Sequence, residues 1–480
     1  MLPRLLLAAL CAKALTAQTL DTVVRFPYEV RELFHVPEGN KLYVSAFVRD
    51  SGTDHIYILD CADMAVRKVI PTGTLSVYAG DHRAAWCPSH NKVYMSFSGG
   101  YPDTGVLAVI DNATDSVLLR LPVGAYDRAI TYNPVWDKLY CAALLPLPSV
   151  ITVLDCAADT VLKTIVLPEH RAGKFAVWDS AGDKMYFGGG GWTNADRVTV
   201  VDCRTDSVVA VIPSRVAMPG LAAYNPLRRK LYVGSSWDEW GVSVIDCATD
   251  SVIKRFSNIF TMIDGVPVYC SAEDKVYWLA MSVTQNKPDT INVIDCATDS
   301  IVRMIPCPAP DRAIWYIAYA PWNNRLYVAS NHLLTVFDCR NDSMIGQARL
   351  GSSPCEVLCN PVDRRIYVSD WWDCAVYVFR EDLQPVSEES WLRPPSPAIL
   401  LRPNPTRGPV TVRLPDGSAR ITGITVTDVQ GRIVRRLACS GSEVHWDGRD
   451  EHGRQVSTGV YQIRTAGPGG AAQTRALVLR

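Results

Sequence analysis

A tripeptide made of a basic residue, an aliphatic residue and a tyrosine recurs eight times along this 480-residue chain. Its basic residues lie at positions 41, 92, 138, 184, 230, 275, 325 and 365, so successive copies are 40 to 51 residues apart. Each copy is preceded by a short apolar segment and a turn, and is followed by a variable segment and two β-rich segments of the types VSVID and TDSVIKRF. Repeats of this length and content predict the four-stranded blades of an all-β fold, the β-propeller.

The last repeat contains only three of its four strands, because it ends at CAVYVF (374–379) and continues into REDLQPVSEES (380–390). LDTVVRFP (20–27) near the N-terminus is similar to the outer strand of the internal repeats, such as ADTVLKTI (158–165). We therefore expect residues 20–27 to complete the final blade and to tie the two ends of the ring together. This arrangement gives eight blades, and seven blades remain the alternative because the last interval is short.

Residues 19–380 resemble the YVTN-repeat (YncE-like) β-propeller family. AYNPLRRKLYVGSS (223–236) and GVSVIDCATDSVIKRF (241–256) carry the resemblance, and similar segments recur in the other repeats. The resemblance implies a propeller that acts outside the cytoplasm through a binding surface. It implies no particular reaction, because propellers have many unrelated activities.

The composition changes after the last repeat. Residues 384–399 are rich in proline and serine and predict a linker, whereas 400–480 contain strand-like segments separated by glycine turns. NPTRGPVTVRL (404–414) and VHWDGRDEHGRQVSTGVYQIR (444–464) resemble the immunoglobulin-like domain of flagellar hook-capping proteins and the sorting domain of the type IX secretion system. We expect a small Ig-like β-sandwich that meets the secretion machinery, attaches the protein to the surface or acts as a spacer.

The N-terminal sequence MLPRLLLAALCAKALTAQ has an early arginine, a short apolar run and a small residue at Ala17. This pattern predicts a signal peptide over 1–17, a propeller over 18–383 and a secreted or bacterial cell-surface protein. No other segment approaches the ~20 apolar residues of a membrane-spanning helix. The 48 basic and 49 acidic residues nearly cancel, so the chain has no net positive charge that would attract nucleic acid. We expect a monomer without a cofactor.

An Asp-Cys pair ends the third strand of most repeats, with its cysteine at 61, 156, 203, 247, 296 and 339. Equivalent positions in separate blades point outward around a ring and cannot converge on one ion, so we expect no metal site and a half-buried structural role. In VIDCATDS (244–251) we expect a hairpin turn in which Asp246 and Asp250 accept nearby backbone N–H groups.

The remaining cysteines raise the question of disulfides in an exported protein. We expect most of them to be free thiols. The candidate bridges lie within single blades: Cys141 with Cys156, Cys270 with Cys296, and Cys355 or Cys359 with Cys374.

Tryptophans occur in the predicted loops between second and third strands, at Trp192, Trp237, Trp240, Trp371 and Trp372. An aromatic rim at this place suits sugars, peptides or cationic groups. The alternative is that these side chains pack between blades, which we favour for Trp371. Arginines recur near the predicted start of the first strands, at Arg31, Arg83, Arg128, Arg171 and Arg312.

In a closed ring these arginines encircle the mouth of the central channel and suit a carboxylate or phosphate ligand. We favour the alternative, in which each guanidinium pairs with a neighbouring acid and pins blades together. His82 and His170 lie beside two of the arginines and suit acid–base chemistry. No nucleophile motif accompanies them, so we assign no catalytic residue.

The resulting hypothesis is an exported, non-enzymatic binding protein whose partner is an extracellular ligand, a glycan or a protein. Two alternatives stay open. The first is a lyase or hydrolase that works at the channel mouth, and the second is a structural surface-layer or adhesion protein.

Overall fold

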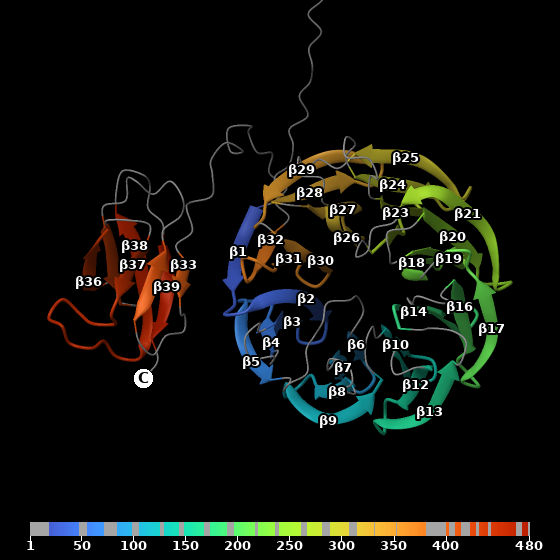
Figure 1. Ribbon diagram of the computed structural model, residues 1–480, viewed down its shortest axis with the longest axis horizontal. Coiled ribbons are helices and arrows are strands. Elements are labelled where there is room, and N and C mark those ends of the chain that lie inside the picture. The colour runs from blue at the N-terminus through green and yellow to red at the C-terminus, as the bar shows by residue number, and fades with distance from the viewer. Residues whose placement is uncertain are drawn as a thin grey trace, which may run out of the picture. The chain divides into compact units, whose positions relative to one another are not determined.

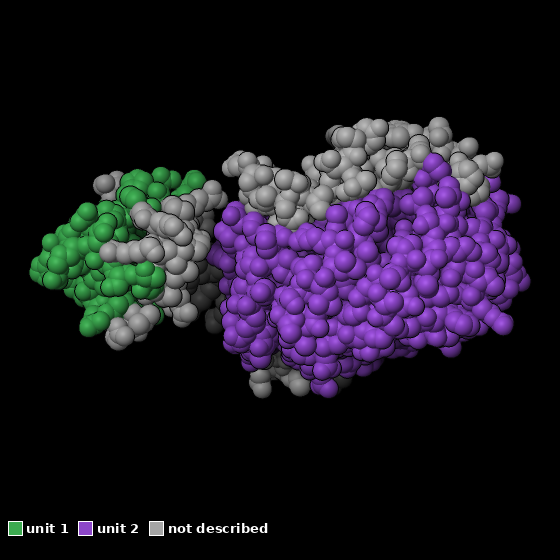
Figure 2. Space-filling view, turned by 90° about the horizontal axis from the view of Figure 1, so that it is seen from below, with its two compact units in different colours: residues 1–14, 386–480 green, residues 15–385 purple. Residues whose placement is uncertain are grey.

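The computed structural model describes the chain in the ranges 19–47, 55–71, 84–97, 105–124, 129–143, 148–167, 173–189, 196–216, 219–235, 240–260, 266–280, 289–306, 314–330, 332–351, 353–380, 400–402, 409–413, 423–428, 432–439, 443–466 and 473–478. Within these ranges the regular secondary structure is entirely β. The chain divides into two compact units, residues 15–385 and residues 386–480 together with 1–14, which Figure 2 colours separately.

Eight four-stranded antiparallel sheets lie around a ring in the described part of the larger unit (Figure 1). Blade 1 contains β2 (Glu29–Val36), β3 (Lys41–Phe47), β4 (His55–Asp60) and β5 (Ala65–Pro71). Blade 2 contains β6 (Ala84–Cys87), β7 (Lys92–Phe97), β8 (Gly105–Asp111) and β9 (Ser116–Val123). Blade 3 contains β10 (Ala129–Asn133), β11 (Lys138–Ala143), β12 (Ser149–Asp155) and β13 (Thr160–Leu167). Blade 4 contains β14 (Phe175–Asp179), β15 (Lys184–Gly188), β16 (Arg197–Asp202) and β17 (Ser207–Pro213).

The second half of the ring repeats this order. Blade 5 contains β18 (Pro219–Asn225), β19 (Lys230–Ser235), β20 (Trp240–Asp246) and β21 (Ser251–Phe260). Blade 6 contains β22 (Val268–Cys270), β23 (Lys275–Ala280), β24 (Thr290–Asp295) and β25 (Ser300–Pro306). Blade 7 contains β26 (Ile314–Ala320), β27 (Arg325–Ser330), β28 (Leu333–Asp338) and β29 (Ser343–Arg349). Blade 8 contains β30 (Pro354–Asn360), β31 (Arg365–Asp370), β32 (Ala375–Arg380) and, from the other end of the chain, β1 (Thr19–Arg25).

The two middle strands of each blade are buried on both faces, which explains their continuous runs of Val, Ile, Leu and Tyr. The outer strands carry exposed residues along most of their length, as in β5 and β13. The hydrophobic core is divided into clusters that lie between neighbouring blades. One such cluster joins Tyr140 and Ile151 of blade 3 to Met185 and Val201 of blade 4.

The chain closes the ring through its N-terminal strand, as the sequence predicted. β1 pairs antiparallel with β32, with Val23 opposite Tyr377 and Arg25 opposite Ala375. Beyond the strand, Phe26 N–H donates to the carbonyl of Cys374 at 2.7 Å. Each of the eight sheets has four strands, which confirms the eight-bladed prediction and excludes the seven-bladed alternative.

The smaller unit contains two antiparallel sheets. One sheet is formed by β33 (Leu400–Arg402), β34 (Val410–Arg413) and β37 (Glu443–Trp446); the other by β36 (Ile433–Ala438), β35 (Gly423–Thr427), β38 (Gly459–Ala466) and β39 (Gln473–Val478). Side chains from both sheets share one buried cluster, in which the Trp446 and Tyr461 rings meet edge to face with centroids 5.5 Å apart. This unit is a small β-sandwich, as expected.

Candidate functional site

The two edges of each blade differ in their connections. At one edge, here called the turn edge, tight turns join the first strand to the second and the third to the fourth, as at 37–40 and 61–64 in blade 1. The antiparallel order places the remaining connections at the opposite edge, here called the loop edge. Most of the residues that connect strands there lie outside the described ranges.

A repeated polar contact joins neighbouring blades at the turn edge. The lysine of the recurring tripeptide forms an ion pair with an aspartate in the third-to-fourth-strand turn of the next blade. The described residues contain six such pairs, with N–O distances of 2.5 to 3.2 Å: Lys41–Asp115, Lys92–Asp159, Lys138–Asp206, Lys184–Asp250, Lys230–Asp299 and Lys275–Asp342. We call this contact the inter-blade clamp.

The tyrosine of the tripeptide strengthens the clamp. Its hydroxyl donates to the same aspartate in five of the six pairs, from Tyr94, Tyr140, Tyr186, Tyr232 and Tyr277 at 2.5 to 2.8 Å. Tyr43 donates instead to Asn112 at 3.1 Å, where the Asp-Cys pair of the repeat is replaced by Asp-Asn. Burial, followed by the aspartate contact, raises the pKa of Tyr140, so this hydroxyl keeps its proton.

The clamp corrects the role predicted for Asp250. Asp246 accepts the N–H of Ala248 at 2.7 Å, as expected for the hairpin. Asp250 instead accepts from Lys184 and Tyr186 of the preceding blade. It has a backbone φ of 52°, which aspartate tolerates better than most residues. The turn therefore aims this carboxylate at the neighbouring blade rather than at its own backbone.

The cysteines of the Asp-Cys pairs are fully buried, not half-buried as predicted. The reason is that the tripeptide strand of the preceding blade covers the turn. The carbonyl of Cys156, for example, accepts from Lys92 at 3.0 Å and from Tyr94 at 3.3 Å. The backbone of this position thus belongs to the clamp.

Two of these cysteines lie against a second cysteine from the neighbouring blade. Cys156 contacts Cys87 at the end of β6, and Cys339 contacts Cys270 at the end of β22. A hydrogen bond from the partner thiol lowers the pKa of Cys87 to about 6 and that of Cys270 to about 7. Cys156 and Cys270 are free thiols that face adjacent blades, in agreement with the expectation that most cysteines are free. The candidate partners in blade 8 are free as well, namely Cys355, Cys359 and Cys374.

The residues proposed from sequence for ligand binding were expected at the loop edge. The structure describes two of those side chains, Arg31 and Trp372. The backbone of Trp240 belongs to β20, but its side chain lies outside the described part. The other candidates also lie outside the described residues: Arg83, Arg128, Arg171, Arg312, His82, His170, Trp192 and Trp237. The predicted ring of arginines therefore remains a prediction.

Arg31 lies within β2 rather than before it, at a register shift between Val30 and Leu33. It is 6% exposed, and its guanidinium carbon is 4.6 Å from the ring centroid of Phe47 and 4.1 Å from that of Trp371. This double cation–π contact joins blade 1 to blade 8. It agrees with the packing interpretation of Trp371.

Trp372 stands beside this stack and is 62% exposed. Its turn is held by the buried carboxylate of Asp370, which accepts the N–H groups of Asp373 at 2.9 Å and Ser353 at 3.0 Å. Burial raises the pKa of Asp370. The turn is further fixed by Arg25, which donates to the carbonyl of Asp373 at 3.2 Å. An exposed indole is thus presented on a well-supported turn of the loop edge.

Sequence reasoning missed the clamp, although both of its members recur in the repeats at constant places. The signal was present as a lysine and an aspartate that are 66 to 74 residues apart in every pair. That separation is longer than one repeat, which indicates a contact between neighbouring units rather than within one. Phe47 and Trp371 as partners of Arg31 had no comparable signal, because their contact occurs at a single interface.

No family model matches the chain, and no curated protein matches it. Among solved structures it is similar to hydrazine synthase of Kuenenia stuttgartiensis, with a TM-score of 0.48 and 16% identity over 64% of this chain and 99% of that one. Within the described ranges, no helix has the length and apolar character needed to cross a bilayer. The sheet order itself defines the larger unit as an eight-bladed β-propeller, followed in the chain by a small β-sandwich.

Proposed function

We propose that the protein is an exported or cell-surface binding protein whose ligand site lies on the loop edge of the propeller, around the channel mouth, and which catalyses no reaction. The observation that carries this proposal is the exposed Trp372 on a fixed turn beside the Arg31–Trp371 stack. The clamps at the turn edge hold the blades together, so the loop edge is free to vary without loss of the fold.

The chemistry of Trp372 favours a glycan or a peptide as the ligand. An exposed indole offers a flat apolar face with one N–H donor, which suits the C–H face of a sugar ring or an apolar side chain. Its turn is fixed by the contacts of Asp370 and Arg25, so binding costs little backbone ordering entropy. The nearby guanidinium of Arg31 is occupied by two rings and supports the platform rather than contacting ligand.

A substitution of Trp372 by alanine tests this site. We expect at least a tenfold loss of affinity for whichever glycan or peptide the wild-type protein selects from arrays of both. The matched control is Trp136→Ala, at an exposed tryptophan of the turn edge whose Nε1 donates to Asp183 at 2.5 Å. The control lowers thermal stability but leaves binding unchanged. Equal binding by wild type and Trp372→Ala, or no ligand in either array, contradicts the proposal.

The arginines predicted at the channel mouth require a separate test. The triple variant Arg83→Ala, Arg128→Ala and Arg312→Ala separates an anion site from a pinning role. Loss of carboxylate or phosphate binding with an unchanged melting temperature supports the anion site. A lower melting temperature with unchanged binding supports pinning between blades.

We further propose that the larger unit is a YVTN-repeat propeller and that the smaller one is an Ig-like sorting or anchoring domain. The repeated segments and the NPTRG (404–408) and WDGRDEHG (446–453) motifs support this proposal. Removal of residues 400–480 is expected to retain the chain in the periplasm of the producing cell, as measured by fractionation. Unchanged export of the truncated chain contradicts the sorting role.

A further inference from the structure

Three side chains that ligate thiophilic metals meet between blades 2 and 3. Cys87 ends β6, Asp137 ends the tight turn before β11, and Cys156 follows β12. Their ligand atoms all lie within 4.8 Å of one another, and Cys87 Sγ is 3.7 Å from Asp137 Oδ1. Both cysteines are fully buried, whereas the Asp137 side chain is 34% exposed. The cluster is therefore a buried pair of thiols with a partly exposed carboxylate beside it.

The dimensions of this cluster suit a tetrahedral zinc site. Zinc–sulfur and zinc–oxygen bonds of the usual length place two sulfur ligands about 3.8 Å apart and a sulfur and an oxygen ligand about 3.6 Å apart. The observed 3.7 Å between Cys87 Sγ and Asp137 Oδ1 agrees with the second value. All the ligand atoms are within 4.8 Å of one another, which is about 1 Å or less beyond the separations that a bound ion requires.

The carboxylate of Asp137 is already oriented by hydrogen-bonding neighbours, and the hydroxyl of one of them, Ser89, also lies 3.3 Å from Cys87 Sγ. His90 Nε2 lies 2.5 Å from Oδ2, and the hydroxyls of Tyr132 and Ser89 each donate to Oδ1 at 2.8 Å. Outer-sphere partners of this kind fix the direction of a ligand and raise metal affinity. The His90 side chain is 30% exposed, so the Asp137 side of the cluster borders solvent at the turn edge.

The sequence predicts no metal site because equivalent positions in separate blades do not converge around the ring. The three residues here occupy different positions of the repeat: the end of a first strand, the first turn of the next blade and the Asp-Cys position. Contact between adjacent blades brings them together.

The same chain contains a natural comparison at the interface of blades 6 and 7. Cys270 and Cys339 repeat the thiol pair, but Asn324 replaces Asp137 and Glu273 replaces His90. Cys270 Sγ donates to Asn324 Oδ1 at 3.5 Å, and the Asn324 amide donates to Glu273 at 2.8 Å. A neutral amide is a poor zinc ligand, so the second cluster provides thiols without the charged third ligand.

We propose that Cys87, Asp137 and Cys156 bind one thiophilic divalent cation, such as zinc, with a water molecule at the fourth position. The bound ion links blade 2 to blade 3 at the turn edge. Its thiolate ligands lie in the buried part of the interface, and the water lies on the solvent side, beside His90. The cluster at blades 6 and 7 binds no metal of this class.

The test uses the full chain, purified under reducing conditions, freed of metal and titrated with cobalt(II) and then zinc(II). We expect one equivalent of cobalt per chain, with thiolate-to-cobalt charge-transfer absorption and the visible bands of tetrahedral cobalt, and displacement of cobalt by zinc. Cys87→Ser with Cys156→Ser abolishes these bands. The matched double variant Cys270→Ser with Cys339→Ser retains them in full.

Two conservative variants keep the test decisive if the double serine variant fails to fold. Asp137→Asn, which reproduces the residue of the other interface, weakens cobalt binding at least tenfold. His90→Ala weakens it about 10- to 100-fold, because an outer-sphere partner is lost. Equal affinity of wild type and Asp137→Asn overturns the proposal. So does a wild type that binds no cobalt when reduced and shows a Cys87–Cys156 disulfide in peptide maps of the untreated protein.

Discussion

The interface between blades 3 and 4 and the interface between blades 8 and 1 hold neighbouring blades together through different contacts. Between blades 3 and 4, Lys138 and Tyr140 share the carboxylate of Asp206 at 2.7 and 2.6 Å. Between blades 8 and 1, where the chain closes on itself, Met64 occupies the place of this aspartate. The repeated interfaces are thus clamped by charge, whereas the closing interface has an apolar side chain at the same turn position.

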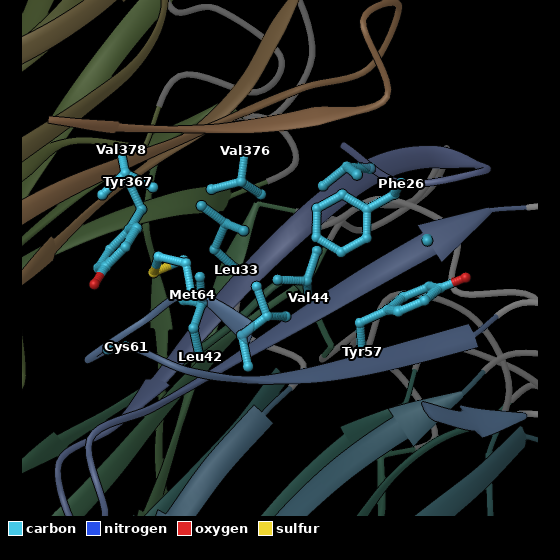
Figure 3. Packing of buried hydrophobic residues seen from close by; sticks show 13 residues of the cluster. Phe26, Leu33, Leu42, Val44, Tyr57, Cys61, Met64, Tyr367, Val376 and Val378 are labelled. Atoms are coloured by element: carbon cyan, nitrogen blue, oxygen red, sulfur yellow. The ribbon is translucent and has the colours of Figure 1, made fainter. Parts of the chain in front are cut away.

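The closing interface compensates in two ways. Arg365 keeps its charge paired within its own blade, with Asp21 at 3.1 Å and Asp363 at 3.3 Å, while it donates to the carbonyl of Cys61 in blade 1. Met64 joins a cluster of thirteen buried residues from both blades, and Figure 3 shows it near Cys61, Leu33 and Leu42. Hydrophobic contact here replaces the ion pair.

Two hydrogen bonds between segments that lie far apart in the sequence add to the closing interface. The N–H of Leu33 donates to Glu356 at 2.5 Å, and Ser369 donates to the carbonyl of Arg31 at 2.7 Å. Within the described residues, the clamp therefore belongs to the interfaces from blades 1 and 2 to blades 6 and 7. The closing interface joins residues more than 300 positions apart and depends on contacts specific to it.

Removal of β1 should have the largest effect, because it removes the fourth strand of blade 8, the Asp21–Arg365 ion pair and part of the packing at the closing interface, and it leaves the internal clamps untouched. Deletion of residues 18–25 removes the fourth strand of blade 8 and the packing of Val23 and Val24, so we expect a loss of about 5 kcal/mol or more in unfolding free energy. Urea denaturation measures it. Leu20→Ala, at a side chain that is 44% exposed, serves as the control and changes stability little. A deletion variant as stable as wild type would falsify the closure by β1.

Loss of the charge in one internal clamp should lower the unfolding free energy less than removal of β1 does. Asp206→Asn keeps the side-chain shape and tolerates the positive φ of 52°, but it leaves Lys138 without its buried partner, which we expect to cost about 2–3 kcal/mol. Asp63→Asn removes an exposed acid from the corresponding turn of blade 1 and serves as the control. Both are measured by thermal unfolding. If the two variants lose equal stability, the clamp contributes no more than a surface ion pair.

The hydroxyl of one clamp tyrosine should have the smallest effect, and that effect depends on pH. Tyr140→Phe is expected to cost about 1 kcal/mol at pH 7. Burial raises the pKa of Tyr140 in the folded protein, whereas tyrosine in an unfolded chain ionises near pH ~10. Its contribution to stability is therefore complete below pH ~10 and is lost as pH rises further. Denaturation at several pH values from 8 to 11 should show a shallower alkaline decline for Tyr140→Phe than for wild type, and parallel curves would contradict the assignment.

Much of the fold could be predicted because the same strand-forming segments recur in each blade. The tripeptide and the VSVID and TDSVIKRF segments identified the strands, and LDTVVRFP (20–27) identified the closing strand. The site was less accessible to sequence reasoning. Arg31 was singled out as a candidate ligand residue, but its placement between Phe47 and Trp371 depends on a register shift in β2 that no repeat pattern indicates.

From period and strand content alone, the sequence predicted the repeated blades, the shared strand and a second β unit, but it left eight and seven blades open. The side-chain contacts between neighbouring blades, and the count of eight blades, came only from the three-dimensional structure. It brought Asp250 to Lys184 and Tyr186, Cys156 to Cys87, and Met64 into an apolar cluster. The physical reason is that strand patterns act within a few residues, whereas the packing of one blade on the next joins positions about 60 to 75 residues apart, and more than 300 at the closure.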